Sequence, residues 1–440
     1  KRAVQGFNNQ AAGTYPGYDR YGRVVIQSWV DGNLTVHATA SNLPSRPPIV
    51  DEGYTYDKNS NRKTKYDLRP GVKLANPDSQ YSYDGLDRLT EAKRGDHTQT
   101  TFATLSGSQK WALDMLGNWV TVKKELTGNS PAYGDVGETE DRSHNEANEI
   151  TNRYPNGSSN SPTYPFAYDD AGNLRTNQYS ATGSNQYTHD AWNRLVKHEL
   201  ITTGYPTLTN AEYEYDGLHW RTVARRHAAV LAAQERVMYY SAAWQLLEER
   251  IDDAYDEEPG PNWVAQEMWG LQYLDDPVLR QRYDPNADGP PAQFYHLTDV
   301  QFNTVAVIGT GADPLLMERV FYDAYGKARH SWPGDFDRNG SANATSDFGL
   351  FSNSSHNGAM GSGNYNVALD LNRDGDVDST DEGMFEAKSS LTSGEISNRG
   401  ADGPDNVFGY DGYAFSGENQ IYCVRFRWYD PGLGRWLQKD

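Results

Sequence analysis

A Tyr-Asp pair that recurs along the chain is the feature that most constrains its fold. Eleven of the thirty tyrosines are followed directly by aspartate, whereas chance pairing at ordinary Asp usage gives about two or three. Most pairs lie in a frame of Tyr-x-Tyr-Asp, Gly or Asn, then Arg-Leu or Asn-Leu, and adjacent copies are about 20 to 30 residues apart, which is typical of repeat architectures. The copies begin at Tyr18, Tyr54, Tyr81, Ala167, Tyr187 and Tyr213, with a degenerate one at Trp111.

The chemistry of one copy predicts a β-hairpin. Two tyrosines two residues apart project from the same face of a strand. The aspartate then begins a turn, where its carboxylate accepts hydrogen bonds from N–H groups two residues on, and Gly or Asn takes a left-handed conformation. Adjacent hairpins would place the tyrosines in rows, each ring pairing with its neighbour. Because one copy cannot bury its rings alone, we expect an all-β fold in which hairpins form a curved spiral sheet, with these residues serving as scaffold.

Charge and composition exclude several classes of partner. The formal net charge is −20, whereas a nucleic-acid partner or an anionic membrane needs a basic face. The single cysteine, Cys423, excludes an internal disulfide, and the absence of about 18 consecutive apolar residues excludes a membrane span. Because the chain begins at Lys1 rather than Met, we expect a processed or excised piece of a longer protein.

Four further segments, together with the repeats, resemble the Rhs/YD-repeat family, whose members include teneurins and the cocoon-forming subunits of insecticidal toxin complexes. Three of them are QEMWGLQYLDDPVLRQR (266–282), YHLTDVQFNTVAVIG (295–309) and ERVFYDAYGKAR (318–329), and the fourth ends the chain. The resemblance implies a YD-repeat region over 1–265, an Rhs repeat-associated core over 266–330 and 401–440, and an insertion over 331–400. The motif of the last segment consists of Arg425, Arg427, Trp428, Tyr429, Asp430, Pro431, Gly434, Arg435 and Trp436.

The same resemblance implies a function. Such a chain is a non-enzymatic bacterial shell, secreted or at the cell surface, that encapsulates a C-terminal toxin-like segment, so its partners are that segment or copies of itself. About 22 strands at about 4.8 Å each close into a ring roughly 34 Å across, which leaves little space inside. We therefore expect about one turn of a spiral, with the aromatic C-terminal segment as the plug that closes it.

Two other functions fit the same residues. Short repeat units could join through exposed strands into an extracellular filament or surface layer that calcium rigidifies, and the acidic surface favours this alternative. Surface aromatics also fit a carbohydrate-binding or adhesion module, although no motif marks a pocket.

The insertion contains ALDLNRDGDVDSTDE, whose spacing is that of a calcium loop of the EF-hand and dockerin type. Oxygen-bearing residues fall at the positions that surround Ca²⁺, and Gly375 falls where the loop turns sharply. The predicted ligands are Asp370, Asn372, Asp374, Asp376, Asp378 and Asp381.

A second, less regular copy lies in GDFDRNGSANATSDF. Its terminal acid falls one position late, with Ser346 in the expected place. With short helices after each loop, the pair resembles a dockerin module that binds a cohesin-like domain; alternatively, Ca²⁺ only folds a surface insertion by neutralising its carboxylates. The predicted ligands of this copy are Asp335, Asp337, Asn339, Ser341, Asn343 and Asp347.

The only catalytic chemistry that we expect comes from the family resemblance, which implies aspartyl self-cleavage just beyond the core. Asp430 and Asp440 are the candidate carboxylates, tuned by Arg427 or Arg435, because two close carboxylates can share a proton. Alternatively, Asp430 is a turn residue before Pro431.

Overall fold

The computed structural model describes residues 17–29, 48–69, 78–98, 101–126, 138–155, 157, 162–227, 233–253, 261–285, 289–309, 315–331, 377–379, 381 and 405–439. In this part of the chain, no helix is long and apolar enough to cross a membrane. Nearly all regular structure is β, as the repeat predicts.

The main element is a single antiparallel sheet of 23 strands. Each strand pairs with the one before it in the chain, so the sheet is a continuous meander. The strands are β1 (Ile26–Trp29), β2 (Val50–Tyr56), β3 (Arg62–Asp67), β4 (Asp78–Tyr83), β5 (Leu89–Thr98), β6 (Thr101–Leu113), β7 (Trp119–Leu126), β8 (Glu138–His144), β9 (Ile150–Pro155), β10 (Tyr164–Tyr168), β11 (Leu174–Gln178), β12 (Gly183–His189), β13 (Leu195–Thr202), β14 (Leu208–Tyr215), β15 (Arg221–Arg226), β16 (Gln234–Tyr240), β17 (Leu246–Asp253), β18 (Trp263–Trp269), β19 (Pro277–Tyr283), β20 (Ala292–Thr298), β21 (Thr304–Gly309), β22 (Leu315–Tyr322) and β23 (Ala328–Ser331).

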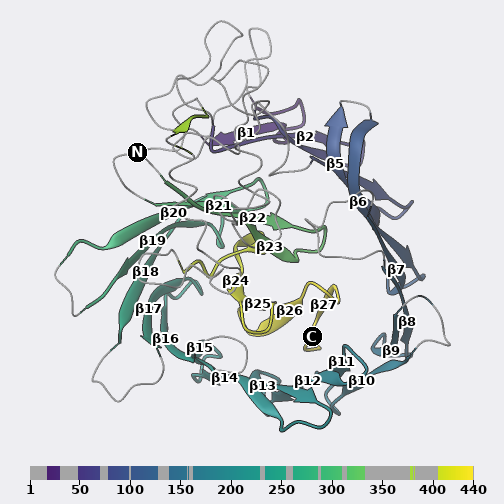
Figure 1. Cartoon of the computed structure of the whole chain (residues 1–440), viewed down its shortest axis with the longest axis vertical. Helices are drawn as coiled ribbons and strands as arrows, with labels where there is room; N and C mark the ends of the chain where they lie inside the picture. The colour runs from purple at the N-terminus through teal and green to yellow at the C-terminus, as the bar shows by residue number, and fades with distance from the viewer. Residues whose placement is uncertain are drawn as a thin grey trace, which may run out of the picture.

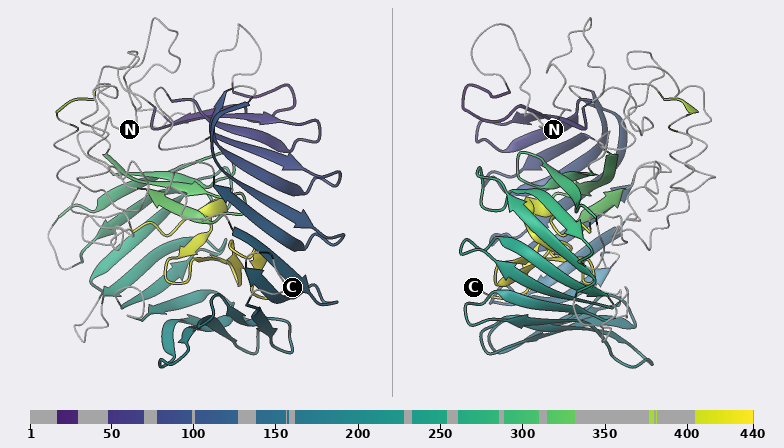
Figure 2. Two further views of the ribbon diagram at one scale, coloured as in Figure 1. Left: turned by 45° about the vertical axis from the view of Figure 1, so that its right-hand side comes forward. Right: turned by 90° about the vertical axis from the view of Figure 1, so that its left-hand side faces the viewer.

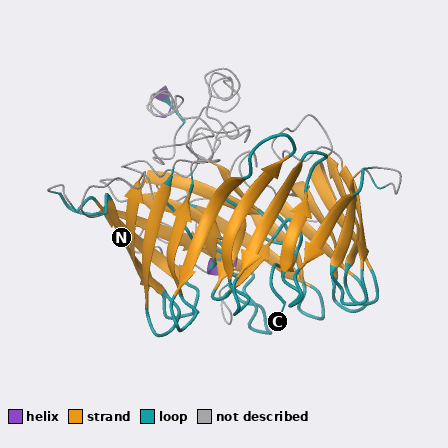
Figure 3. Cartoon of the chain, turned by 90° about the horizontal axis from the view of Figure 1, so that it is seen from below, coloured by secondary structure: helices purple, strands orange, loops and turns teal. Residues whose placement is uncertain are grey.

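The repeat forms one kind of turn. At Asp84, the carboxylate accepts hydrogen bonds from the N–H groups of Leu86 and Arg88 at 2.9 and 3.0 Å. Asp87, the fourth residue, is left-handed with φ of 60°, as a three-residue hairpin loop with a bulge requires. Since the connected strands alternate in direction, all these turns lie along one rim of the sheet, and Figure 3 shows loops gathered at the sheet edges. Within the described residues the turn begins at Asp19, Asp57, Asp84, Asp114, Asn145, Asp169, Asp190, Asp216, Ser241, Asp299 and Asp323.

In four hairpins, the tyrosine before the aspartate attaches the hairpin to the one before it. The hydroxyl of Tyr83 donates to the main-chain oxygen of Arg62 at 2.9 Å. Arg62 is the first residue of β3, directly after the preceding repeat turn. Tyr56, Tyr215 and Tyr322 bond in the same way to the oxygens of the corresponding residues of their preceding hairpins. In these Tyr-Asp pairs, the aspartate therefore stabilises its own turn, and the tyrosine hydroxyl bonds to the preceding hairpin.

The other repeat tyrosines differ from the expectation that rings pair with rings across strands. The guanidinium of Arg62 lies between the rings of Tyr54 and Tyr81, at 5.9 and 5.1 Å from their centroids. Arg221 lies over Tyr213 at 5.5 Å in the equivalent place. In these two hairpins, cation–π contacts with the arginine that begins the return strand (β3 or β15) therefore take the place of the predicted ring pairs.

The sheet curves round until its last strands pack inside its first (Figures 1 and 2). A buried apolar cluster joins Ile49 and Val50 to Leu297, Val305, Ala306 and Ile308 at this seam. The side chains of Gln27 and Trp29 both donate to the main-chain oxygen of Thr298, at 2.9 and 2.8 Å. Among the described strands, none at the start of the sheet pairs with one at its end. The sheet, which we call the wall, is therefore one overlapping turn of a spiral, as predicted, and not a closed barrel.

Most of the predicted insertion over 331–400 lies outside the described residues. Its expected helical calcium module, and the boundaries expected for it and for the two β regions, therefore remain predictions. Of the insertion, the structure describes Ser331, Val377, Asp378, Ser379 and Asp381.

Candidate functional site: the enclosed C-terminal segment

The C-terminal segment, residues 405–439, lies inside the curved wall (Figure 1). It has its own small antiparallel sheet, and we call it the plug. Its elements are the 3-10 helix η3 (Tyr410–Gly412) and strands β24 (Ala414–Ser416), β25 (Ile421–Val424), β26 (Arg427–Asp430) and β27 (Arg435–Trp436).

The plug supplies part of the hydrophobic core inside the wall. Trp428 and Tyr422 are fully buried, and Trp428 contacts the ring of wall residue Tyr213 at 4.7 Å between centroids. One buried cluster combines Ile421 and Leu437 of the plug with several wall residues. Burying a ring the size of Trp428 stabilises the fold by about 5 kcal/mol. Without the plug, this face of the wall would be exposed to water.

Hydrogen bonds fix the plug to the repeat turns. The hydroxyls of Tyr422 and Tyr429 donate to the main-chain oxygens of Gly326 and Tyr325, at 2.8 and 2.9 Å. From the opposite part of the wall, Arg142 donates to the oxygen of plug residue Leu433 at 2.8 Å. The plug is therefore held by both the early and the late hairpins.

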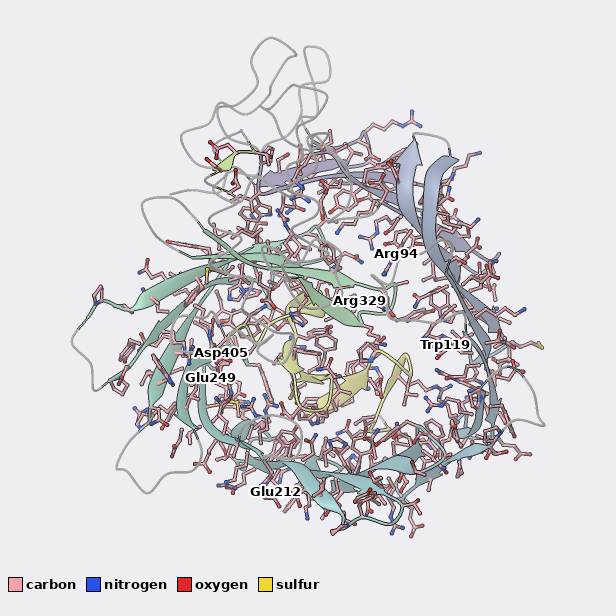
Figure 4. The ribbon with its side chains drawn as sticks, in the orientation of Figure 1. Arg94, Trp119, Glu212, Glu249, Arg329 and Asp405 are labelled. Carbon is pink, nitrogen blue, oxygen red and sulfur yellow. The ribbon has the colours of Figure 1, made fainter. Side chains whose placement is uncertain are left out.

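A buried cluster of ion pairs fixes the start of the plug. Asp405 accepts hydrogen bonds from Arg236 and Arg280 of the wall, at 2.8 and 3.1 Å. Glu249 bonds to the same two arginines, and Glu267 pairs with Arg280. Asp405 and Glu249 lie close together in Figure 4. We call these five residues the ion cluster; it contains two cations and three carboxyl groups.

The charge imbalance of the ion cluster appears in its pKa values. Burial raises the pKa of Glu267 to about 7, and Glu249 and Asp405 add to the rise, although Arg280 opposes it. A proton on Glu267 leaves two carboxylates facing two guanidinium groups. Burial and the nearby Arg280 lower the pKa of His296 to about 3, so this histidine is neutral near pH 7.

The residues predicted for self-cleavage fall in different surroundings. The carboxylate of Asp430 accepts hydrogen bonds from the N–H groups of Gly432 and Leu433, at 2.8 and 3.1 Å, as a turn residue does. Burial raises its pKa, against the opposing effect of these bonds and of Arg142. Arg427 stacks on the ring of Trp436 at 4.2 Å.

Arg435 and Asp440 are the other two residues predicted for self-cleavage. Arg435 donates to the main-chain oxygen of Asn148 and to the side chain of Asn118. Those residues belong to two neighbouring repeat turns, so Arg435 ties the plug to the rim. Asp440, the second predicted carboxylate, lies outside the described residues.

Nearly all the predicted calcium ligands lie outside the described residues. The exceptions are Asp378 and Asp381, where the Asp381 carboxylate accepts a hydrogen bond from the Asp378 N–H at 3.0 Å. Among the described residues, no group of three or more His, Cys, Asp or Glu side chains is placed to hold a metal ion. The other predicted ligands, in neither case described, are Asp370, Asn372, Asp374 and Asp376 of the first loop and Asp335, Asp337, Asn339, Ser341, Asn343 and Asp347 of the second.

Sequence reasoning missed the ion cluster and three of the turns. Asn145 and Ser241 begin turns of the repeat type without a Tyr-Asp pair, and Asp299 does so after a threonine. A search for any side-chain acceptor followed four residues later by Asn, Arg, Glu or Gln would have found them. The ion cluster has no such signal, because Asp405 is 169 residues from Arg236.

No protein-family model matches the chain, and no curated protein does. The Rhs/YD-repeat likeness therefore stays a resemblance of motifs.

Several solved structures of Tc toxin chains are similar in fold. They include a TcdB2-TccC3 crystal structure (12% identity, 96% of this chain and 19% of that chain, TM-score 0.39) and one of TcdB2-TccC3-Cdc42 (11%, 96% and 19%, 0.37). A third is the Photorhabdus luminescens Tc holotoxin pore with a TccC3 mutation (11%, 96% and 20%, 0.37). The chain spans about a fifth of the length of these neighbours.

Proposed function

We propose that the chain is a non-enzymatic β-shell scaffold that encloses and orders its own C-terminal segment, in a secreted or cell-surface setting. The observation that carries this proposal is the burial of the plug: Trp428, Tyr422, Ile421 and Leu437 are almost completely shielded by the wall. The interior cavities described below and beside the plug measure about 40, 60 and 180 Å³. Each of these cavities among the described residues is smaller than a folded domain, which supports the enclosed segment as the cargo of this unit.

The single cysteine provides the test, because Cys423 lies in β25 of the plug and is buried. A thiol reagent added to the native full-length chain should label Cys423 only as fast as the plug is exposed. In denaturant, labelling should be as fast as that of a free thiol. If native Cys423 reacts at the free-thiol rate, the plug is not enclosed and the proposal is wrong.

A second candidate, association of copies into a filament or layer, has one observation in its favour. The third residue of several repeat turns is a large apolar side chain exposed on the rim, and exposed apolar groups of this kind favour contact with another surface. These residues are Tyr21, Leu86, Leu116, Trp192 and Leu218. Electron micrographs with and without EDTA discriminate the candidates: single rings under both conditions support the scaffold alone, whereas polymers that need calcium support association.

Calcium binding by the insertion is part of this proposal and rests on the loop spacing from Asp370 to Asp381. A calcium titration of the full chain tests it. Asp370→Ala should abolish binding at the first loop, and Asp170→Ala, at an exposed turn position, should leave it unchanged. Equal binding by both variants would refute this assignment.

A further inference from the structure

A polar cavity of about 180 Å³ lies at the seam, where the last strands pack inside the first. It is bounded by β2 to β5 on one side, by the β20–β21 turn and β22 on the other, and by Tyr410 of the plug. We call it the seam cavity. Its volume equals that of about six water molecules, which is small for a drug-sized ligand and ample for a small ion.

The lining of the seam cavity is cationic, in contrast to the acidic chain as a whole. Five basic side chains line it against three acidic ones. Lys65 pairs with Glu52 and Asp299, and Arg69 pairs with Asp67. The lining also includes Arg62, Arg94, Arg319 and Asp323.

Arg62 is the group that most needs a ligand. Its Nη1 is buried and has no hydrogen-bond partner, and a buried donor without an acceptor is costly. The nearby Asp299 does not serve it, because that carboxylate accepts bonds from Lys65, from the Gln301 N–H and from both the main chain and side chain of Asn303.

Arg94 and Arg319 hold the two sides of the seam cavity together. Nη2 of Arg94 donates to the main-chain oxygen of Tyr322 at 2.5 Å, and Nη2 of Arg319 donates to that of Ile49 at 3.0 Å. Arg94 lies on the inner side of the wall in Figure 4. Both guanidinium groups are therefore fixed in place before any ligand arrives.

The positive potential at this site also affects the pKa of Tyr81. Burial alone would raise the pKa of its hydroxyl, but Arg62, Arg94 and Lys65, together with a hydrogen bond to Ser79, more than offset that effect, and the pKa is lowered. The neighbouring cations therefore favour negative charge at this point.

We propose that the seam cavity binds a small oxyanion, such as phosphate, sulfate or a carboxylate, through Arg62 with Arg94 and Arg319. Guanidinium groups bind such anions through charge-assisted, often paired hydrogen bonds. Since the cavity spans the overlap of the first and last hairpins, a bound oxyanion would fasten the spiral closed. This inference goes beyond the proposed scaffold function, which does not require it.

The test is a titration of the full-length chain with sodium phosphate, sulfate and acetate at constant ionic strength, with chloride as the reference. Calorimetry and the midpoint of thermal unfolding are both measured, because a ligand of the folded state raises that midpoint. We expect saturable stabilisation by at least one oxyanion. The order of the three salts shows whether a tetrahedral or a planar anion is preferred.

Two variants locate the site. Arg62→Gln should weaken the binding about tenfold or more, the effect of one lost charge-assisted hydrogen bond, and Arg94→Gln gives the same readout if Arg62→Gln does not fold. Arg194→Gln is the matched control, because Arg194 also lies on a tyrosine ring, that of Tyr215, far from the seam cavity, and it should leave the binding unchanged. No saturable effect of any oxyanion beyond chloride, or wild-type binding by both cavity variants, would overturn the proposal.

Discussion

The indole N–H of Trp428 donates to the hydroxyl of Tyr215 at 3.2 Å, and that hydroxyl donates in turn to the main-chain oxygen of Leu195 at 2.8 Å. One repeat tyrosine thus fastens its hairpin to the previous hairpin and also receives the central side chain of the plug. Tyr215→Phe removes both bonds and leaves the buried indole N–H without a partner. We expect a loss of about 2 kcal/mol in the free energy of unfolding, measured by denaturant titration.

The control for that substitution is Tyr239→Phe, on a tyrosine that is largely exposed. It should change stability by less than about 0.5 kcal/mol. Equal effects of the two substitutions would mean that the bond between wall and plug contributes nothing.

Gly434 of the plug has a left-handed backbone and lies directly against Trp119 of the wall. A Cβ at this position would be 2.3 Å from the ring, so Gly434→Ala should displace the plug and accelerate thiol labelling of Cys423. Gly204 is also left-handed, with φ of 86°, but has open space around it. Gly204→Ala should therefore show only the backbone strain, about 1 kcal/mol, and leave the labelling rate close to that of the wild type.

Arg280 at the centre of the ion cluster should be far more sensitive than a surface cation. Arg280→Met leaves Glu249, Glu267 and Asp405 without one of their two counter-ions, and removal of one partner from a buried pair costs about 3–5 kcal/mol. Lys110 makes an exposed ion pair with Glu125 at 3.0 Å, and Lys110→Met should cost at most about 1 kcal/mol. Thermal or denaturant unfolding measures both, and the prediction fails if Arg280→Met is as mild as Lys110→Met.

Glu267 should make the fold less stable as pH rises. Its pKa is about 7 in the folded chain against an ordinary 4.5, so the folded state keeps a proton that the unfolded chain loses. The stability from this proton is present below pH 4.5 and is lost as pH rises to about 7. Glu267→Gln should remove that slope and make the variant more stable than the wild type above pH 7, by about 1–3 kcal/mol. Parallel pH profiles would contradict this.

His198 should have the opposite effect in acid. Burial lowers its pKa to about 4 from 6.5, so the unfolded chain takes up a proton that the folded chain refuses. The stability from neutral His198 is present above pH 6.5 and is lost as pH falls to about 4. Because His198 bonds to Asn210, which in turn holds the main-chain oxygen of Glu418 in the plug, acid should also speed the labelling of Cys423. His198→Gln should make both changes shallower, and an unchanged acid profile would rule this role out.

The local part of the fold was predictable from sequence, because each hairpin is specified within a few residues. The turn acid at Asp84 and its bond to the N–H two residues on follow from side-chain chemistry alone. The degenerate copy at Trp111 was also assigned correctly, since Asp114 closes the same turn.

The other features of the fold depend on contacts between segments that are far apart in the sequence. The bond from Tyr83 to Arg62 needs the next hairpin in register, and the replacement of ring pairs by Arg62 between Tyr54 and Tyr81 depends on how the strands are offset. The aromatic content of the plug indicated burial but not which wall residues would receive it. The placement of Asp405 against Arg236 and Arg280 could not be read from any spacing.

At the seam, the two ends of the sheet overlap and are not joined strand to strand. A closed barrel must match its number of strands to a fixed stagger, so a whole hairpin cannot be inserted without rebuilding the closure. Here the two ends are clasped by Gln27 and Trp29 on the oxygen of Thr298 and by an apolar overlap. We therefore expect that hairpins can be added or removed between the two ends while the same seam contacts form, so that the number of repeats sets the circumference of the wall.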